Sequence, residues 1–463
     1  LLSLFGGQQL SVTAGYNSGR LSEGALGIGW YHNYEKHIAA DGTGYRVYDN
    51  PGVYSYYEPA EGGKFSCVSK SRQGYLLTVS ETGFTLDLGG ESTESYDSSG
   101  RLTAVTDKQG FVTQIAYSEN LITVTDTVSG KHIYMQYGSD GLITRIYDDG
   151  GRETKLNYEN DYLIGITDVD NNRLSYTYSS NGRIESGTDG AGVCYFKNVY
   201  DNEGRVTEQT DGASPGKKTY ITYKENGVRE VKDRTEAVST HVFNEDGQLI
   251  SYTDANGNTT QYTYDENLNT SSVTDPLGHT SSAVYNSLNK PVSITDRNGC
   301  TTLYTYDTNG NVTGIIHPQK GDINSDGFVD ITDLVRFKKA AAAYSAVTNQ
   351  YNTDMNPDGS INSLDLAGLR IMLLENMNIR NTESFTYNEY NQLLTYTDLR
   401  GTVTVNTYDS ARMLSAQKVG EREKTVSYEN GLLFRKVTLK AILRGITITG
   451  LNSSLPKLTA KTV

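Results

Sequence analysis

The chain has 463 residues and a net charge of −14, and this balance argues against nucleic acid as a partner because phosphate binding needs a basic surface. No run approaches the ~20 apolar residues that would span a bilayer, so we expect no membrane span. Tyr (35) far outnumbers Phe (10), and Gly is frequent (47) while Pro is scarce (8), a bias that favours strands joined by glycine and Asn/Asp turns over a helical core.

The chain begins at Leu1 without an initiator Met, and its N-terminus has no signal-peptide pattern. We therefore expect a fragment or a processed chain, with any export signal outside it. The cysteines Cys67, Cys194 and Cys300 are far apart in the chain and form no CxxC or zinc spacing. We expect buried or free thiols, with neither a disulfide framework nor a redox site.

Aromatic residues recur every 21 positions in the middle of the chain, and an Asp follows each of the first three by eleven positions. The aromatic positions are Phe243, Tyr264, Tyr285 and Tyr306, and the acidic positions are Asp254, Asp275 and Asp296. With steps of 20 to 23 positions the pattern extends upstream through Tyr96, Tyr117, Tyr137, Tyr158, Tyr178, Tyr200 and Tyr223, and it resumes downstream at Tyr387, Tyr408 and Tyr428. Such self-similarity indicates a repeat architecture.

Each 21-residue unit contains two turns and two short alternating segments. This leaves about six residues per strand, the usual length for antiparallel strands. We interpret each unit as a β-hairpin whose aromatic residue packs on the next unit, and whose Asp caps its own turn by accepting backbone N–H groups.

The repeat pattern resembles the YD repeats of the Rhs family. The resemblance is carried by YDSSGRLTAVTDKQG from Tyr96 to Gly110, by YDNEGRVTEQTDG from Tyr200 to Gly212, and by a segment from Tyr16 to Glu35 that is similar to the one preceding those repeats. It implies strands wound into a hollow β-shell, often around a variable C-terminal toxin. We expect a mainly β fold in which an antiparallel hairpin array forms a partial shell or spiral.

The repeat is interrupted after Tyr306, because the next in-phase aromatic is Tyr387, 81 positions on, which is 60 positions more than one unit. Insertions are best tolerated at exposed turns. We therefore predict a module inserted into a hairpin turn, with its two ends, near residues 318 and 380, close in space. The predicted domains are an N-terminal β region (1–95), a first repeat block (96–317), an insert (318–380), a second repeat block (381–428) and a basic tail without repeats (429–463).

The insert contains two matching segments, DINSDGFVDITD from Asp322 to Asp333 and DMNPDGSINSLD from Asp354 to Asp365, offset by 32 positions. Calcium takes about six to eight oxygen ligands, and loops with oxygen side chains at positions 1, 3, 5, 9 and 12 and Gly at position 6 supply them. Position 7 contributes its backbone carbonyl. The predicted ligands of two Ca2+ ions are Asp322, Asn324, Asp326, Phe328, Asp330 and Asp333 in the first loop, and Asp354, Asn356, Asp358, Ser360, Asn362 and Asp365 in the second.

A calcium loop followed by one helix and duplicated within about 60 residues resembles a type I dockerin, an EF-hand-like module. The resemblance covers Gly321 to about Asn376. It implies binding to a cohesin module of a cellulosomal scaffold, and hence an extracellular protein of an anaerobic bacterium. The family contacts cohesin through loop positions 10 and 11 and positions near 17 and 18. By register these are Ile331, Thr332, Lys338 and Lys339 in the first half, and Ser363, Leu364, Arg370 and Ile371 in the second.

Catalytic patterns are weak throughout the chain. The six histidines form no HExxH set, and nearly all Asp and Glu residues fall on repeat turns, so no carboxylate pair stands out for glycoside hydrolysis. We interpret the chain as a secreted, non-catalytic scaffold that docks onto cohesin and displays a β-surface, for which polysaccharide or a cell surface is the candidate ligand. The alternative is a component of a polysaccharide-degrading system, or a toxin carrier, whose catalytic module (an O-glycosyl hydrolase in the first case) lies outside this chain.

Overall fold

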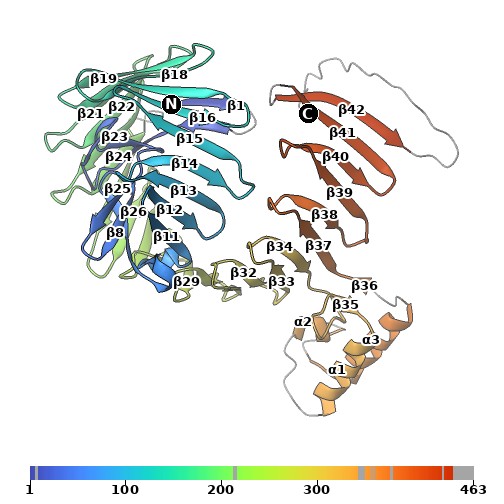
Figure 1. The fold of residues 1–463 in the computed structure, drawn as a ribbon. Coiled ribbons are helices and arrows are strands. Elements are labelled where there is room, and N and C mark those ends of the chain that lie inside the picture. The colour runs from blue at the N-terminus through green and yellow to red at the C-terminus, as the bar shows by residue number, and fades with distance from the viewer. Residues whose placement is uncertain are drawn as a thin grey trace. The chain divides into compact units, whose positions relative to one another are not determined.

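The computed structural model describes residues 1–5, 9–211, 216–342, 350–355, 357, 360–375, 379–429 and 432–441. The chain divides into two compact units, Leu1–Thr302 and Leu303–Val463, and Figure 1 shows the elements of each. In the part of the chain described, no helix has the length and apolar character needed to cross a membrane.

The first unit is almost entirely β. Its first strands are β1 (Leu2–Phe5), β2 (Gln9–Val12), β3 (Ala14–Tyr16), β4 (Glu23–Gly24), β5 (Gly27–Ile28) and β6 (Trp30–His32). The next strands, with two short 3-10 turns among them, are β7 (His37–Asp41), β8 (Gly44–Asn50), β9 (Val53–Pro59), η1 (Glu61–Gly63), β10 (Lys64–Cys67), η2 (Lys70–Arg72), β11 (Tyr75–Ser80), β12 (Gly83–Leu88), β13 (Ser92–Asp97), β14 (Leu102–Asp107), β15 (Val112–Tyr117), β16 (Leu121–Asp126), β17 (His132–Tyr137), β18 (Ile143–Asp148), β19 (Glu153–Glu159) and β20 (Tyr162–Thr167). The remaining strands of this unit are β21 (Arg173–Tyr178), β22 (Ile184–Asp189), β23 (Cys194–Tyr200), β24 (Val206–Asp211), β25 (Lys218–Tyr223), β26 (Val228–Lys232), β27 (Val238–Phe243), β28 (Leu249–Thr253), β29 (Thr259–Tyr264), β30 (Thr270–Thr274), β31 (Thr280–Tyr285) and β32 (Pro291–Thr295).

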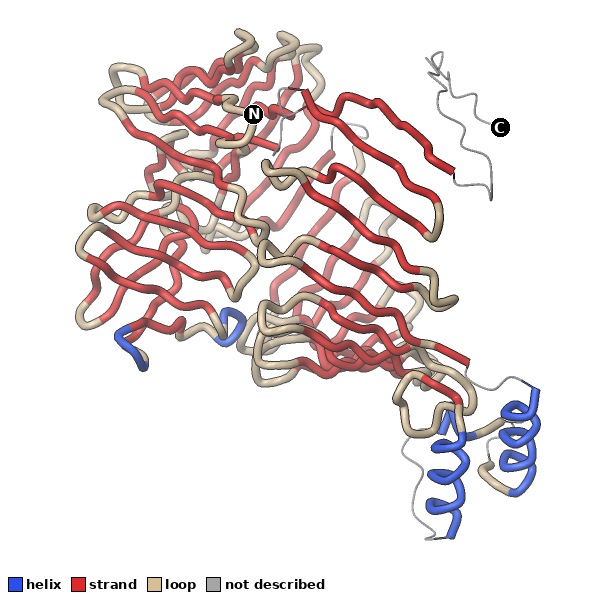
Figure 2. The backbone as a smooth tube through the Cα atoms, turned by 45° about the vertical axis from the view of Figure 1, so that its right-hand side comes forward, coloured by secondary structure: helices blue, strands red, loops and turns tan. Residues whose placement is uncertain are grey.

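From β7 to β32, each strand pairs antiparallel with the next one along the chain. Figure 2 shows the resulting succession of strands and tight turns. The prediction of a mainly β, antiparallel hairpin array is confirmed. Pairing between chain neighbours follows from the repeat, because a hairpin brings together only residues that are close in sequence.

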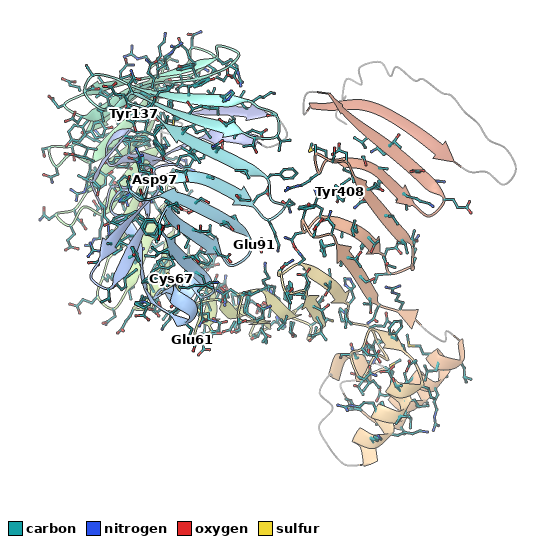
Figure 3. The ribbon with its side chains drawn as sticks, viewed as in Figure 1. Glu61, Cys67, Glu91, Asp97, Tyr137 and Tyr408 are labelled. Carbon is teal, nitrogen blue, oxygen red and sulfur yellow. The ribbon has the colours of Figure 1, made fainter. Side chains whose placement is uncertain are left out.

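The recurring Asp residues cap the turns, as predicted. Asp254 Oδ1 accepts the backbone N–H groups of Asn256 and Asn258, both at 2.9 Å, and Asp275 Oδ1 accepts those of Leu277 and His279. The Asp that directly follows a repeat tyrosine caps its turn in the same way, as Asp97 does for Ser99 and Arg101 (Figure 3). Each turn thus satisfies two backbone donors within five residues, as Asx turns do.

The recurring tyrosines connect successive hairpins through their hydroxyl groups. Tyr264 donates to the carbonyl of Leu249 at 2.7 Å, fifteen positions back, and Tyr408 (Figure 3) donates to that of Leu393 at 2.9 Å. The same bond type is made by Tyr117, Tyr158, Tyr178, Tyr200, Tyr223, Tyr285 and Tyr387. The hydroxyl bonds therefore fix the register between neighbouring hairpins, and the rings of Tyr117, Tyr158 and Tyr178 also pack against the buried core.

The N-terminal segment lies against strands far along the first unit. Trp30 Nε1 donates to the Tyr178 hydroxyl at 2.9 Å, and its ring centroid is 5.1 Å from that of Tyr176. The backbone N–H of Ile28 donates to Asp161 O at 2.9 Å. Trp30 and Tyr176 belong to one buried apolar cluster that also contains Leu2, Leu10, Ile133, Ile146 and Leu163, so this segment covers the core of the array.

The second unit contains β33 (Thr301–Tyr306), which starts at the boundary, β34 (Val312–Ile316), β37 (Thr382–Tyr387), β38 (Leu393–Thr397), β39 (Val403–Tyr408), β40 (Leu414–Val419), β41 (Arg422–Glu429) and β42 (Leu432–Ala441). These strands also pair antiparallel in order. Between β34 and β37 lie β35 (Phe328–Val329), α1 (Ile331–Ala342), α2 (Gln350–Thr353), α3 (Ser363–Glu375) and β36 (Ile379–Arg380).

The hairpin register is the same on both sides of these helices. Ile316 pairs with Thr382, 66 positions on, whereas Thr253 at the equivalent position of an uninterrupted hairpin pairs with Thr259, six positions on. The two separations differ by 60 positions, the length of insert predicted from the interrupted repeat. The backbone N–H of His317 donates to Asn381 O at 2.9 Å, so the expectation that the ends of the insert lie close together is met beside positions 318 and 380.

The helical module has its own apolar core. Ile323, Val329, Phe337 and Leu369 are buried together, and Leu334, Met355, Ile361, Leu366, Met372 and Leu373 pack around them. Leu334 and Phe337 lie at helical spacing on α1, and Leu366, Leu369, Met372 and Leu373 do so on α3, so the two helices pack against each other around this core.

Candidate calcium and partner-binding site

The first predicted calcium loop is curled by hydrogen bonds between its own carboxylates and its own backbone. Asp333, at position 12, accepts the N–H groups of Ile323 at 2.7 Å, Asn324 at 3.1 Å and Asp330 at 2.8 Å. Asp322, at position 1, accepts those of Asp326 at 3.2 Å and Gly327 at 3.1 Å. The first and last loop residues therefore both close the loop.

Gly327 is required at position 6 of this loop. Its φ is +91°, a backbone conformation that residues other than glycine rarely adopt. A Cβ added there would stand 1.8 Å from Thr382 Oγ1. The turn that brings positions 1 and 12 together therefore depends on glycine.

The second loop repeats these bonds with the same offset of 32 positions. Asp365 accepts the N–H groups of Met355 and Asn362, both at 2.7 Å, as Asp333 does for the equivalent residues of the first loop. Asn362 Oδ1 accepts the N–H of Leu364 at 2.7 Å. The sequence duplication is thus also a duplication of local structure.

Burial determines the protonation behaviour of the carboxylates that close the loops. Asp322, Asp333, Asp354 and Asp365 are buried, and burial raises the pKa of Asp322 and of Asp333. Asp330 is less buried, and the hydroxyl of Thr332, which donates to it, lowers its pKa. Buried carboxylates disfavour their charged form unless a positive charge is near, so a cation among them would relieve this cost.

The donor set of the loops fits calcium. Carboxylates, amide oxygens and a backbone carbonyl are the hard ligands that Ca2+ takes, and the twelve-residue curl with glycine at position 6 is the framework that presents them. Among the described residues, no three His, Cys, Asp or Glu side chains are grouped as they would be around a metal ion. The fit therefore rests on donor chemistry and loop conformation, and the twelve ligands stay predictions.

The remaining predicted ligands differ in exposure. Asp326, Phe328, Ser360 and Asn362 are exposed, whereas Asn324 and Asp330 are partly buried. Two ligands predicted for the second loop, Asn356 and Asp358, lie outside the described residues.

The eight residues predicted to contact cohesin are all exposed. Ile331 is 63 % exposed on α1, and Leu364 and Ile371 are 62 % and 54 % exposed on α3. Leu374, one turn beyond Ile371, is 85 % exposed. Apolar side chains at this exposure on neighbouring turns form a candidate contact surface, and their assignment to cohesin remains a prediction.

Sequence reasoning missed the residues that join the insert to the array. Asn381 Nδ2 donates to Asp322 Oδ2 at 3.1 Å, and Thr382 Oγ1 donates to Gly327 O at 3.1 Å. His317 Nε2 and Glu383 Oε1 are 2.7 Å apart; Tyr396 donates to the same carboxylate, and these two partners lower the pKa of Glu383, Tyr396 more than His317. No periodic signal marks these positions.

The architecture defines a class: an array of antiparallel hairpin repeats with a helical module of two duplicated, EF-hand-like loops inserted at one turn. Sequence-family comparisons assign both parts. Residues 320–374 match the type I dockerin domain, and residues 243–280 and 285–321 match the RHS repeat. The chain therefore carries RHS repeats and a type I dockerin domain, and domains of the latter kind generally bind calcium.

Solved structures similar to this chain include complexes of bacterial Tc toxins. The crystal structure of TcdB2-TccC3-Cdc42 is 10% identical over 89% of this chain and 25% of that chain, with a TM-score of 0.38. The Photorhabdus luminescens Tc holotoxin pore is 10% identical over 88% of this chain and 26% of that chain, with a TM-score of 0.32. This chain thus spans about a quarter of their length. No curated protein matches the chain.

Proposed function

We propose that this chain is a secreted, non-catalytic adaptor that binds a cohesin module through its dockerin when two calcium ions fill the dockerin loops. The observation that carries the proposal is the duplication of both loops in sequence and in hydrogen bonding, with the same offset kept throughout. The twelve predicted ligands would hold the two ions, one in each loop. Cellulosomal, extracellular localisation belongs to the same proposal.

The partner surface of the proposal is the exposed face of α1 and α3. Its two halves differ chemically, since the first offers Lys338 and Lys339 where the second offers Arg370 and Ile371. Identical halves would allow a partner to bind in two orientations. The difference therefore favours one orientation, and the more apolar second half, with Leu364 and Ile371, is the better candidate for the central contact.

Calorimetric titration of the full chain with a panel of cohesin modules, in calcium and in EGTA, tests this proposal. We expect binding in calcium and none in EGTA. Leu364→Asp and Ile371→Asp should each weaken it at least tenfold, because they place a charge in an apolar contact. Leu399→Asp, in which an equally apolar side chain, 44 % exposed, lies in the array, is the matched control and should leave binding unchanged. Binding to no cohesin, or equal binding in EGTA, would refute the proposal.

The array would then be the displayed part of the adaptor, with polysaccharide or a cell surface as its ligand. Tyrosine offers a flat apolar face and a polar tip, and Tyr54, Tyr195, Tyr220 and Tyr390 are exposed. Arg46 lies over the ring of Tyr54 and Arg412 over that of Tyr390, and the Tyr54 ring also contacts that of Tyr48, so part of each ring is already covered. Retention on cellulose, xylan or cell-wall fractions tests this part, and no retention would remove it.

The alternative function places this chain in a polysaccharide-degrading system or in a toxin carrier. In either case a catalytic module outside residues 1–463 would carry the activity. The sequence on either side of this chain separates the possibilities, because a glycoside hydrolase or nuclease module there would favour the alternative.

A further inference from the structure

Asn381 lies after the helical module, outside both twelve-residue loops, yet it contacts the first loop directly. It is 4 % exposed. Its Nδ2 donates to Asp322 Oδ2 at 3.1 Å and to His317 O at 2.5 Å, and its backbone N–H donates to Gly327 O at 3.1 Å. This one residue therefore joins the strand entering the module, the strand leaving it, and loop positions 1 and 6.

The oxygen of the Asn381 side-chain amide, Oδ1, has no hydrogen-bond partner in the described part of the chain. This oxygen is buried and lies 3.6 Å from the point where a Cβ on Gly327 would stand. Burying an amide oxygen without a partner is unfavourable, because the oxygen loses its hydrogen bonds to water and gains none in return. An unpartnered oxygen retained beside the tight turn of the first loop points to a role at that loop.

Two further contacts attach this loop to the returning strand. Thr382 Oγ1 donates to Gly327 O at 3.1 Å, and β35 pairs with β36 through Phe328↔Arg380 and Val329↔Ile379. Phe328 occupies position 7, whose carbonyl is a predicted ligand. Positions 1, 6 and 7 are therefore all held by residues 380–382.

The second loop has no counterpart of Asn381 by sequence register. The residue 32 positions beyond Asn381 is Met413, which belongs to a hairpin turn of the array, where its carbonyl accepts the N–H of Asp409 at 2.9 Å. The duplication that relates the two loops therefore does not extend to this contact. We expect residues 380–382 to hold the first loop in place and to leave the second loop without an equivalent contact.

We propose that Asn381 is a positioning residue for the first calcium loop, so that this loop is completed by the returning strand of the array and the second loop is not. The inference rests on the proposed calcium binding. A hydrogen bond to a ligand carboxylate orients it, and losing such a bond typically lowers metal affinity about 10- to 100-fold. Because linkage is reciprocal, calcium in the first loop also stabilises the pairing of β34 with β37.

Hydrogen exchange of the full chain, followed by mass spectrometry across a calcium titration, resolves the two loops separately. The readout is the calcium concentration at half-maximal protection of the peptide covering 322–333 and of the peptide covering 354–365. Asn381→Ala should raise this midpoint at least tenfold for the first loop and leave that of the second within twofold. Asn406→Ala removes another buried asparagine of the array, whose Nδ2 donates to Leu393 O, and should move neither midpoint.

Thr382→Val keeps the shape of its side chain and removes only the bond to Gly327 O, so it tests the inference even if Asn381→Ala fails to fold. It should raise the first midpoint alone, by a smaller factor. Two outcomes would overturn the inference: equal shifts of the calcium midpoint in both loops, or no shift with either variant. In both cases calcium would still protect the two loops of the unmodified chain, so calcium binding itself would stand. No protection by calcium in the unmodified chain would overturn both.

Discussion

Nearly all aromatic positions of the repeat are tyrosine, and Phe243 is the exception among fourteen. A ring alone would satisfy packing between hairpins, so the preference needs a reason that involves the hydroxyl. The structure gives one, because Tyr264, Tyr285 and the other tyrosines named with them donate to a backbone carbonyl of the preceding hairpin, whereas Tyr96 donates to Glu94. At Phe243 this bond is missing, and the guanidinium of Arg229 lies 4.0 Å from the ring centroid instead.

Tyr264→Phe should lower the free energy of unfolding of its part of the array by about 1 kcal/mol, the usual net contribution of one hydrogen bond. The ring and its packing are unchanged, so only the bond to Leu249 O is lost. Tyr262→Phe, two positions earlier on the same strand, is the control, since no hydrogen bond of its hydroxyl is found in the described part of the chain. Urea denaturation compares the two variants; equal losses would show that the bond contributes nothing specific.

His32 is buried and Glu35 partly buried in the N-terminal segment, and their titrations change the stability of the fold with pH in opposite directions. Burial raises the pKa of Glu35 to about 7 and lowers that of His32 to about 4. The folded state therefore holds the Glu35 proton more tightly than the unfolded state does. Stability falls as the pH rises from the pKa of Glu35 in the unfolded state toward 7. His32 behaves in the opposite way, because the unfolded state binds its proton more tightly. Stability therefore rises as the pH rises from about 4 to the pKa of His32 in the unfolded state.

Glu35→Gln removes the first of these contributions. When the pH is raised from about 5 to about 8, the free energy of unfolding of the variant should increase by about 2 kcal/mol. That of the unmodified chain should change little, because its two contributions nearly cancel. Trp30 is the only tryptophan in the chain and lies in the same segment, so its fluorescence during urea denaturation reports on this region. Glu159→Gln, an exposed glutamate in β19, is the control; an unchanged pH dependence in Glu35→Gln would contradict the raised pKa of Glu35.

At the scale of elements, the helical module replaces a single hairpin turn. The short segment 254–258 connects β28 to β29, and the much longer segment 317–381 connects β34 to β37 in the same register. Tyr387 donates to Val312 O across 75 positions, where Tyr264 reaches its partner across fifteen. The bond between hairpins is therefore made across the insertion as though the insert were absent.

Replacing residues 317–381 with the five-residue turn Asp-Ala-Asn-Gly-Asn, copied from 254–258, should leave the array folded. The strand ends it joins, Ile316 and Thr382, already pair, and the copied turn caps itself through its Asp. We expect an unchanged strand signal in far-UV circular dichroism and loss of calcium and cohesin binding. Loss of the strand signal would mean that the module is part of the array's folding unit.

The sequence predicted those features that depend on local spacing. The repeat period predicted the hairpins, the Asp-capped turns and the length of the insert, and the loop motif predicted the two helices that follow. It did not predict Asn381 at the first loop, or Trp30 against Tyr176, because such contacts join residues far apart in the chain and carry no period. The tyrosine preference was a usable signal for the hydroxyl bonds, since composition alone separates Tyr from Phe. The domain boundaries stay predictions.

At the scale of the whole molecule, we expect one part of the chain to need calcium for folding and the other part to fold without it. The two loops hold seven carboxylates, Asp322, Asp326, Asp330, Asp333, Asp354, Asp358 and Asp365. Without a cation their charges repel, and a module built around such loops gains much of its folding energy from the metal. The array has its own buried core and its own turn caps, so its stability has no such dependence.

Far-UV circular dichroism of the full chain in calcium and in EGTA tests this separation most directly, with the turn-replaced variant as the control. We predict that EGTA removes the helical signal of α1 and α3 from the full chain, leaves the strand signal in place, and changes nothing in the variant. A helical signal that is unchanged in EGTA, or a strand signal lost together with it, would contradict this prediction.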